Sequence, residues 1–329
     1  MFTKKNPINI VKNCQKLLLN LETNETKKTN IKQIEKIIND LNSISQIIFG
    51  SEKKVPNPQN ISVLADEVFS SNFMIQLIQN LSKFPFEVRK TIVKIFEFLL
   101  FQKTQNNKLP TEYISEKFLT ILFEGYTNEI TSINCGMMIR TCAQDESLAK
   151  NIFLSKNLET LFESVESPSF DIASDAFRTL KDLFTSNKNS LSNFFVDNYE
   201  RCSKIFKQAL QSKNYAAKRQ YLELISFLII KSPIKIMLKY FLDSEHFLLI
   251  ISLMLSESQS IQIEAFHIAK FFIMNPKRND NITQILVNQS KQIIDFLQNF
   301  SVQEKIKDET FEVDSKKVLQ EILKMNSKK

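Results

Sequence analysis

Apolar residues recur every three or four positions through most of the chain, which is the pattern of amphipathic helices. Five segments share this pattern, and successive segments begin roughly 40 to 46 residues apart. They are FEVRKTIVKIFEFLL (86–100), EITSINCGMMIRTC (129–142), FDIASDAFRTLKDLF (170–184), YAAKRQYLELISFLI (215–229) and IQIEAFHIAKFFIM (261–274). This recurrence predicts an array of helical repeats.

Further apolar helical patterns lie between these segments, at 114–123, 148–162, 191–210 and 282–297. A unit of two or three helices cannot bury its apolar faces alone, so successive units stack and share a core. We therefore predict an all-α, right-handed helical-repeat solenoid of the armadillo or HEAT type, a curved rod with a concave binding face. It would form a single domain over 1–329, with repeats from about 9 to 300 and a C-terminal capping helix at about 311–325.

The stretch SFDIASDAFRTLKDLF (169–184) carries three aspartates among apolar residues. One helical stripe is apolar and consists of Ala173, Ala176, Phe177, Leu180 and Phe184. A second stripe is charged, with spacings that suit exposed ion pairs, and consists of Asp171, Asp175, Arg178 and Asp182. Ser167 before Pro168 is the expected helix cap. We interpret the charged stripe as a solvated face, with a partner-facing stripe as the alternative.

Composition supports a helical chain, because 3 Gly and 8 Pro leave few residues for the tight turns of sheet folds. The formal net charge is +7, with a pI near 9.0. The lysine pairs of this protein are scattered along the chain rather than clustered, so we expect no nucleic-acid partner. These pairs are Lys4-Lys5, Lys27-Lys28, Lys53-Lys54 and Lys316-Lys317.

The four cysteines, Cys14, Cys135, Cys142 and Cys202, are too few and too scattered for a disulfide framework, which suits a reducing compartment. The longest uninterrupted apolar run, FLLIISLML (247–255), is about half the length of a membrane span. The first residues, MFTKKNPINIVKN, contain no apolar segment typical of a signal peptide. We expect a cytoplasmic protein with no membrane insertion, monomeric on its own.

The residues needed for common catalytic sites are scarce. Isolated glycines at 50, 125 and 136 exclude glycine-rich phosphate loops, and no acidic cluster contains the glycine of a calcium loop. His246 and His267 are the only histidines, and His267 lies within an apolar helical pattern. Cys135 and Cys142 share a helical face without further ligands nearby, so we expect core residues. We predict no enzyme activity, no cofactor and no metal site.

Several stretches resemble a known family. NCGMMIRTCAQDESLAKNI (134–152), SFDIASDAFRTLKDLFT (169–185), KRQ (218–220) and IQIEAFHIAKFFIMNP (261–276) are similar to signature stretches of the calcium-binding protein 39 family, also called morula protein 25. The resemblance extends from about residue 9 to about residue 300. It implies a non-catalytic scaffold that binds STRAD-type pseudokinases and related germinal-centre kinases and holds them in an active-like arrangement. It also implies roles in cell polarity, morphogenesis or division.

The resemblance further implies a pocket for the partner's aromatic C-terminal tail, Trp-Glu-Phe. Arg219, in the matching KRQ, is the expected basic contact to this tail, and Lys218 is a second candidate. Glu223 and Leu248 stand where the family pattern has basic residues, and the 230–234 turn is one residue short. Specificity for the tail would therefore be altered or lost, because Glu223 would repel a carboxylate. Ile234 and Ile251 are expected to line an apolar part of the pocket.

Three other interpretations remain. One is an importin-like armadillo adaptor for an extended peptide, although such grooves use tryptophan ladders and this chain has no Trp. Another is a Pumilio-type RNA reader, although no trio of base-reading residues recurs from repeat to repeat. An enzyme without a recognisable motif is the third.

Overall fold

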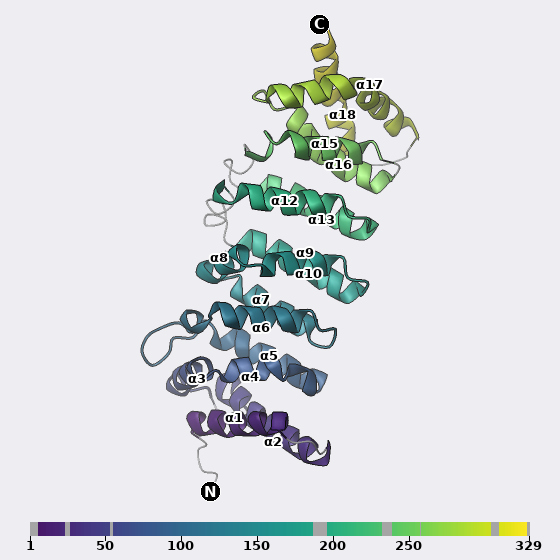
Figure 1. Cartoon of the computed structure of the whole chain (residues 1–329). Coiled ribbons are helices and arrows are strands. Elements are labelled where there is room, and N and C mark those ends of the chain that lie inside the picture. The colour runs from purple at the N-terminus through teal and green to yellow at the C-terminus, as the bar shows by residue number, and fades with distance from the viewer. Residues whose placement is uncertain are drawn as a thin grey trace. The chain divides into compact units, whose positions relative to one another are not determined.

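The computed structural model describes residues 6–23, 27–52, 55–186, 196–231, 239–256, 258–303 and 309–327. All regular elements in these residues are helices, which confirms the predicted all-α, helical-repeat fold class (Figure 1). The chain forms two compact units, Met1–Asn187 and Lys188–Lys329. The prediction of a single domain is not tested by this division.

Unit 1 contains ten α-helices in its described residues, with short 3-10 turns at Leu81–Lys83 and Pro110–Tyr113. The α-helices are α1 (Pro7–Thr23), α2 (Lys27–Phe49), α3 (Pro58–Ser70), α4 (Phe73–Gln79), α5 (Phe86–Leu99), α6 (Glu116–Tyr126), α7 (Ser132–Cys142), α8 (Glu146–Leu154), α9 (Asn157–Val165) and α10 (Phe170–Ser186). The described residues of unit 2 form α12 (Tyr199–Leu210), α13 (Tyr215–Lys231), α15 (Ser244–Met254), α16 (Gln259–Ile273), α17 (Asp280–Gln303) and α18 (Glu309–Asn326).

The five similar sequence segments form α5, α7, α10, α13 and α16, here called the repeat helices. Within unit 1, α2 packs on α5, α5 on α7, and α7 on α10. Within unit 2, α13 packs on α16, and α16 packs on α18. Each repeat helix therefore has a helix from a neighbouring repeat as its partner, as repeat stacking requires. The predicted C-terminal helix is α18, which packs on α17 as well as α16.

The helices bury the apolar positions of their sequences. On α5, Ile92, Val93, Ile95, Phe96 and Leu99 are buried. All four cysteines are buried and free, as expected of core residues, and burial raises the pKa of Cys135 to about 12. No single described helix is both long and apolar enough to cross a membrane, although the bent pair α3–α4 meets that test by length and composition when taken together.

The charged stripe of α10 is only partly a solvated face, so that interpretation was wrong for one aspartate. Asp171 and Arg178 are exposed, but the Asp175 side chain is only 11% exposed and accepts a hydrogen bond from Arg140 Nη1 at 2.8 Å. Asp175 also accepts a hydrogen bond from the Tyr126 hydroxyl at 3.1 Å. A long-range partner on α7 thus draws one carboxylate of the stripe into the helix interface.

The start of α10 also differs from the prediction. The helix begins at Phe170 rather than directly after Ser167, and Ser169 supplies the first carbonyl of the helix, which accepts from Ala173 N. The Ser167 hydroxyl instead accepts from Ser169 N at 3.2 Å, within the turn that precedes the helix. Pro168 therefore lies in this turn and not at the first helical position.

A glycine permits the close contact of α7 with α10. A Cβ atom at Gly136 would lie 2.0 Å from Asp175 Oδ2 and 2.8 Å from Tyr126 Cε2. Side chains essentially never approach so closely, so any larger residue would separate the two helices or displace Asp175 from Arg140. This close contact accounts for Gly136 in the interior of α7, a position at which glycine normally destabilises a helix.

We expect Gly136→Ala to lower the free energy of unfolding by about 1–3 kcal/mol, even though alanine favours a helix over glycine by about 1 kcal/mol. Urea titration of the purified chain measures this change. In an Asp175→Ala background the same substitution should cost less, because the closest clashing atom is gone. Equal costs in both backgrounds would contradict the proposed clash.

Candidate functional site

Three of the predicted site residues lie on α13. The Asn214 side chain caps this helix by accepting hydrogen bonds from Ala216 N and Ala217 N, at 3.0 and 3.2 Å. Lys218 is half-buried, whereas Arg219 and Glu223 are both exposed. Because residues four apart share a helical face, a positive and a negative side chain stand one turn apart on the surface of α13.

Arg219 belongs to a cluster that joins the start of α13 to the start of α16, formed by Tyr215, Arg219, Ser258 and Ser260. Hydrogen bonds from the hydroxyls of Ser260 and Ser258 lower the pKa of Tyr215, and the positive charge of Arg219 lowers it further. The Tyr215 side chain is itself half exposed. We call these four residues the Tyr215 cluster; it presents an aromatic ring, hydroxyls and one cation to solvent.

The other predicted site residues belong to, or come shortly before, α15. Leu248 is 48% exposed, and Ile251 is 1% exposed and lies in the core of unit 2. Ile234 lies outside the described residues. Both α13 and α15 pack against α16. The proposed lining role of Ile251 and Ile234 stays a prediction.

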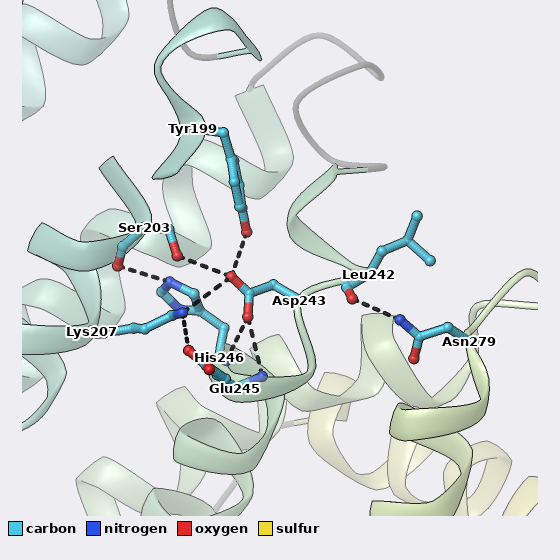
Figure 2. A network of polar contacts seen from close by, with 8 residues as sticks. All are labelled: Tyr199, Ser203, Lys207, Leu242, Asp243, Glu245, His246 and Asn279. Carbon is cyan, nitrogen blue, oxygen red and sulfur yellow. Dashed lines mark hydrogen bonds and ion pairs between the residues drawn. The ribbon is translucent and has the colours of Figure 1, made fainter. Parts of the chain in front are cut away.

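A buried polar network positions α15 (Figure 2). Asp243 caps this helix, with Oδ1 accepting from the backbone amides of Glu245 and His246, each at 3.1 Å. Its Oδ2 accepts from the hydroxyls of Tyr199 and Ser203 on α12, each at 2.9 Å. One carboxylate therefore fixes both the start of α15 and its distance from α12.

Lysine adds charge to this network. Lys207 Nζ lies 3.6 Å from Asp243 Oδ2 and also contacts the Glu245 carboxylate. Burial tends to raise the pKa of Asp243, but the His246 amide, the His246 ring and the two α12 hydroxyls together bring this pKa below its usual value. The carboxylate is thus held in its charged form.

The network contains Ser203, His246 and Asp243, the residue types of a catalytic triad, in an arrangement that cannot act as one. In a triad the histidine accepts the serine proton and donates to the aspartate. Here the Ser203 hydroxyl donates directly to Asp243, and His246 Nε2 lies 3.2 Å from the Ser203 carbonyl oxygen. Both Ser203 and His246 are buried, so the arrangement holds helices together.

The sequence interpretation did not single out the aromatic residues that begin several repeat helices. Phe86, Phe170 and Tyr215 are the first residues of α5, α10 and α13, and they are 58%, 80% and 50% exposed. Phe86 is also within 6 Å of two cations, with Lys90 Nζ 5.2 Å and Arg89 Cζ 5.8 Å from its ring centre. An aromatic residue at the first helical position, outside the apolar stripe, is the signal that could have identified them.

Comparison with known sequences decides the family. A profile described as Mo25-like matches residues 1–326. The chain belongs to the Mo25-like family. The human protein "Calcium-binding protein 39-like" is 35% identical over 327 residues, covering 98% of this chain and 96% of the relative. "MO25-like protein 2" of Caenorhabditis elegans is 31% identical, with 97% and 96% covered, and the "Mo25-like protein" of Schizosaccharomyces pombe is 28% identical, with 92% of each covered.

Membership of the Mo25-like family confirms the resemblance inferred from the signature stretches and indicates a scaffold-type protein. The human relative is named for calcium binding. In the part of this chain that the structure describes, no three His, Cys, Asp or Glu side chains gather closely enough to hold a metal ion. The prediction of no metal site stays a prediction.

The buried histidine predicts how stability depends on pH. Burial lowers the pKa of His246 from 6.5 to about 4, so the folded chain binds fewer protons than the unfolded chain between these values. The free energy of unfolding should therefore fall as pH falls through this window, by at most about 1.4 kcal/mol per pH unit from this group. Urea midpoints measured from about pH 7 to about pH 5 test this expectation.

Two variants separate this contribution from others. His246→Gln should make the free energy of unfolding depend less steeply on pH, because a glutamine side chain does not titrate. His267→Gln removes the other histidine and serves as the matched control. If His246→Gln and the unmodified chain lose stability in parallel on acidification, His246 is not the titrating group.

Proposed function

We propose that this Mo25-like protein is a non-catalytic scaffold that binds a STRAD-type pseudokinase or a germinal-centre-type kinase and stabilises its active-like conformation. The observation that carries the proposal is membership of the Mo25-like family over residues 1–326. Signalling in cell polarity, morphogenesis or division, in the cytoplasm, belongs to the same proposal.

The exposed aromatic residues support a protein-binding role for the repeat helices. Aromatic side chains are enriched among the residues that contribute most to protein interfaces, because each buries a large apolar area at little entropic cost. Phe170 is 80% exposed although it begins an otherwise well-packed helix. Contact of such a ring with water is unfavourable in the isolated chain. Burial of the ring by a partner would remove this cost and favour binding.

The Tyr215 cluster supports a second contact, to the partner's tail. Arg219 supplies a fixed positive charge with several donors, which suits the carboxylates of a tail such as Trp-Glu-Phe. Burying one Trp and one Phe gives roughly 8–12 kcal/mol of gross stabilisation, against association costs of about 4–15 kcal/mol. The tail alone should bind weakly, and a second contact to the same partner raises its effective concentration.

Activation follows from preferential binding. A kinase fold exchanges between inactive and active-like conformations, and a scaffold shifts this equilibrium only as far as it binds one of them better. No catalytic group of the scaffold is needed for this effect. The partner's conformation at the surface that meets the repeat helices would determine the size of the shift.

We expect the purified protein to bind a peptide ending in Trp-Glu-Phe, and Arg219→Ala to weaken this binding about 10- to 100-fold, because a charge-assisted hydrogen bond is lost. Glu223→Lys should strengthen it, since a carboxylate one turn from Arg219 becomes a cation. Isothermal calorimetry measures both changes. Arg178→Ala, which removes an exposed arginine of unit 1, is the matched control.

The outcomes have separate meanings. If only Glu223→Lys binds the peptide, the chain has kept the pocket and changed its tail specificity. If neither the unmodified protein nor any variant binds the peptide, the proposal that this protein binds the partner's tail is wrong. Binding of the kinase fold would then be the only contact that remains in the proposal.

Binding of a recombinant STRAD-type pseudokinase domain without its tail tests the other contact. Phe86→Ala and Phe170→Ala should each weaken this binding about tenfold or more, as loss of a large buried aromatic contact does. Biolayer interferometry gives the dissociation constants. Leu19→Ala, on α1, removes a similarly exposed apolar side chain outside the repeat helices and should change little. Equal effects of all three substitutions would contradict the assignment.

A further inference from the structure

The inward face of α18 holds its acidic residues in ion pairs. Asp314 Oδ2 lies 2.7 Å from Lys270 Nζ, and Glu321 Oε1 lies 3.0 Å from Arg278 Nη2. The hydrogen bond from Lys270 is the main reason that the pKa of Asp314 lies below its usual value. The helix buries Val318 between these two pairs and Ile322 directly after the second. These two carboxylates thus attach α18 to the rest of unit 2.

This attachment leaves the outward face with an excess of positive charge. Lys316, Lys317 and Lys324 are exposed, and the spacings of three, four and seven residues place them on one side of the helix with Val313 and Leu323. The two aliphatic side chains are 54% and 49% exposed. Among the α18 side chains that the structure describes, Glu312 is the sole exposed carboxylate, at the edge of this face. We call Val313, Lys316, Lys317, Leu323 and Lys324 the lysine face.

We propose that the lysine face of α18 binds the surface of an anionic lipid bilayer. Its cations are spread along one exposed face of a helix, so they meet a flat layer of negative head groups more readily than a compact acidic ligand. All three are lysines, which act as flexible point charges, and none offers the planar fork with which arginine grips a single carboxylate or phosphate.

The aliphatic side chains fit the same partner. Val313 and Leu323 are exposed on the same side of the helix as the lysines and can enter the head-group region, while the long lysine side chains keep their ammonium groups in water. The apolar side of α18 is already buried in unit 2, so the helix cannot sink into the acyl chains as a free amphipathic helix does. Binding would be peripheral, reversible and sensitive to salt.

Sedimentation of the full chain with vesicles tests the proposal. Vesicles of phosphatidylcholine with roughly one third phosphatidylserine should bind the protein, and vesicles of phosphatidylcholine alone should not. Each neutralised lysine is expected to weaken binding about fivefold, so Lys316→Gln/Lys317→Gln/Lys324→Gln should bind about a hundredfold more weakly. Raising the salt concentration should release the unmodified protein.

A matched variant controls for net charge. Lys12→Gln/Lys16→Gln/Lys36→Gln removes three exposed lysines from α1 and α2 and should bind the vesicles nearly as well as the unmodified chain. The double variant Lys316→Gln/Lys324→Gln leaves the 3.8 Å pair of Lys317 with Asp314 intact, so it keeps the test valid if the triple variant unfolds.

Three results would overturn the proposal. One is failure of the unmodified, folded protein to bind the anionic vesicles at low salt. Another is an equal loss of binding in the two triple variants, which would assign the effect to overall charge. The third is binding of polyglutamate or RNA by the lysine face without binding of vesicles, which would assign it to another kind of partner.

Discussion

Every repeat of this protein depends on its neighbours for burial of its apolar side chains. A single amphipathic helix such as α5 has a broad apolar stripe, and one partner helix from its own repeat cannot cover it. Helix α5 packs against α2 and α7, and α7 packs against α5 and α10 as well as α6. Stability in each unit is thus built from contacts between successive repeats, and a repeat taken alone would expose its core.

Apolar burial holds the repeats together but does not fix how far one is displaced along the next. Polar contacts supply that information, because hydrogen bonds in a buried interface tolerate little change in distance or angle. Asp243 accepts simultaneously from α12 and from the first amides of α15, so neither helix can shift without breaking a bond. Asp175 has the same role between α7 and α10, where Gly136 allows the approach.

Periodicity predicted the helices because that signal is local: each segment shows its own apolar stripe and its length. Burial of Asp175 could not be predicted in this way, since it depends on Arg140, which lies 35 residues earlier in the sequence. The Tyr215 cluster likewise needs Ser258 and Ser260, which follow α13 at a distance along the chain. The family resemblance of the KRQ stretch identified Arg219 as a site residue, and this residue is exposed on α13. The exposure of Phe170, in contrast, became visible only in the structure.

Three polar contacts in unit 2 join residues about one repeat length apart along the chain: Tyr199 with Asp243, Lys270 with Asp314, and Arg278 with Glu321 are 44, 44 and 43 residues apart. Inserting one residue into a helix turns all later side chains by about 100°. An insertion between Tyr199 and Ser203 would therefore point one of the two hydroxyls away from Asp243. An added residue in a surface loop has no such effect. Over evolutionary time the protein can gain and lose residues in its loops, while the lengths of its helices are constrained.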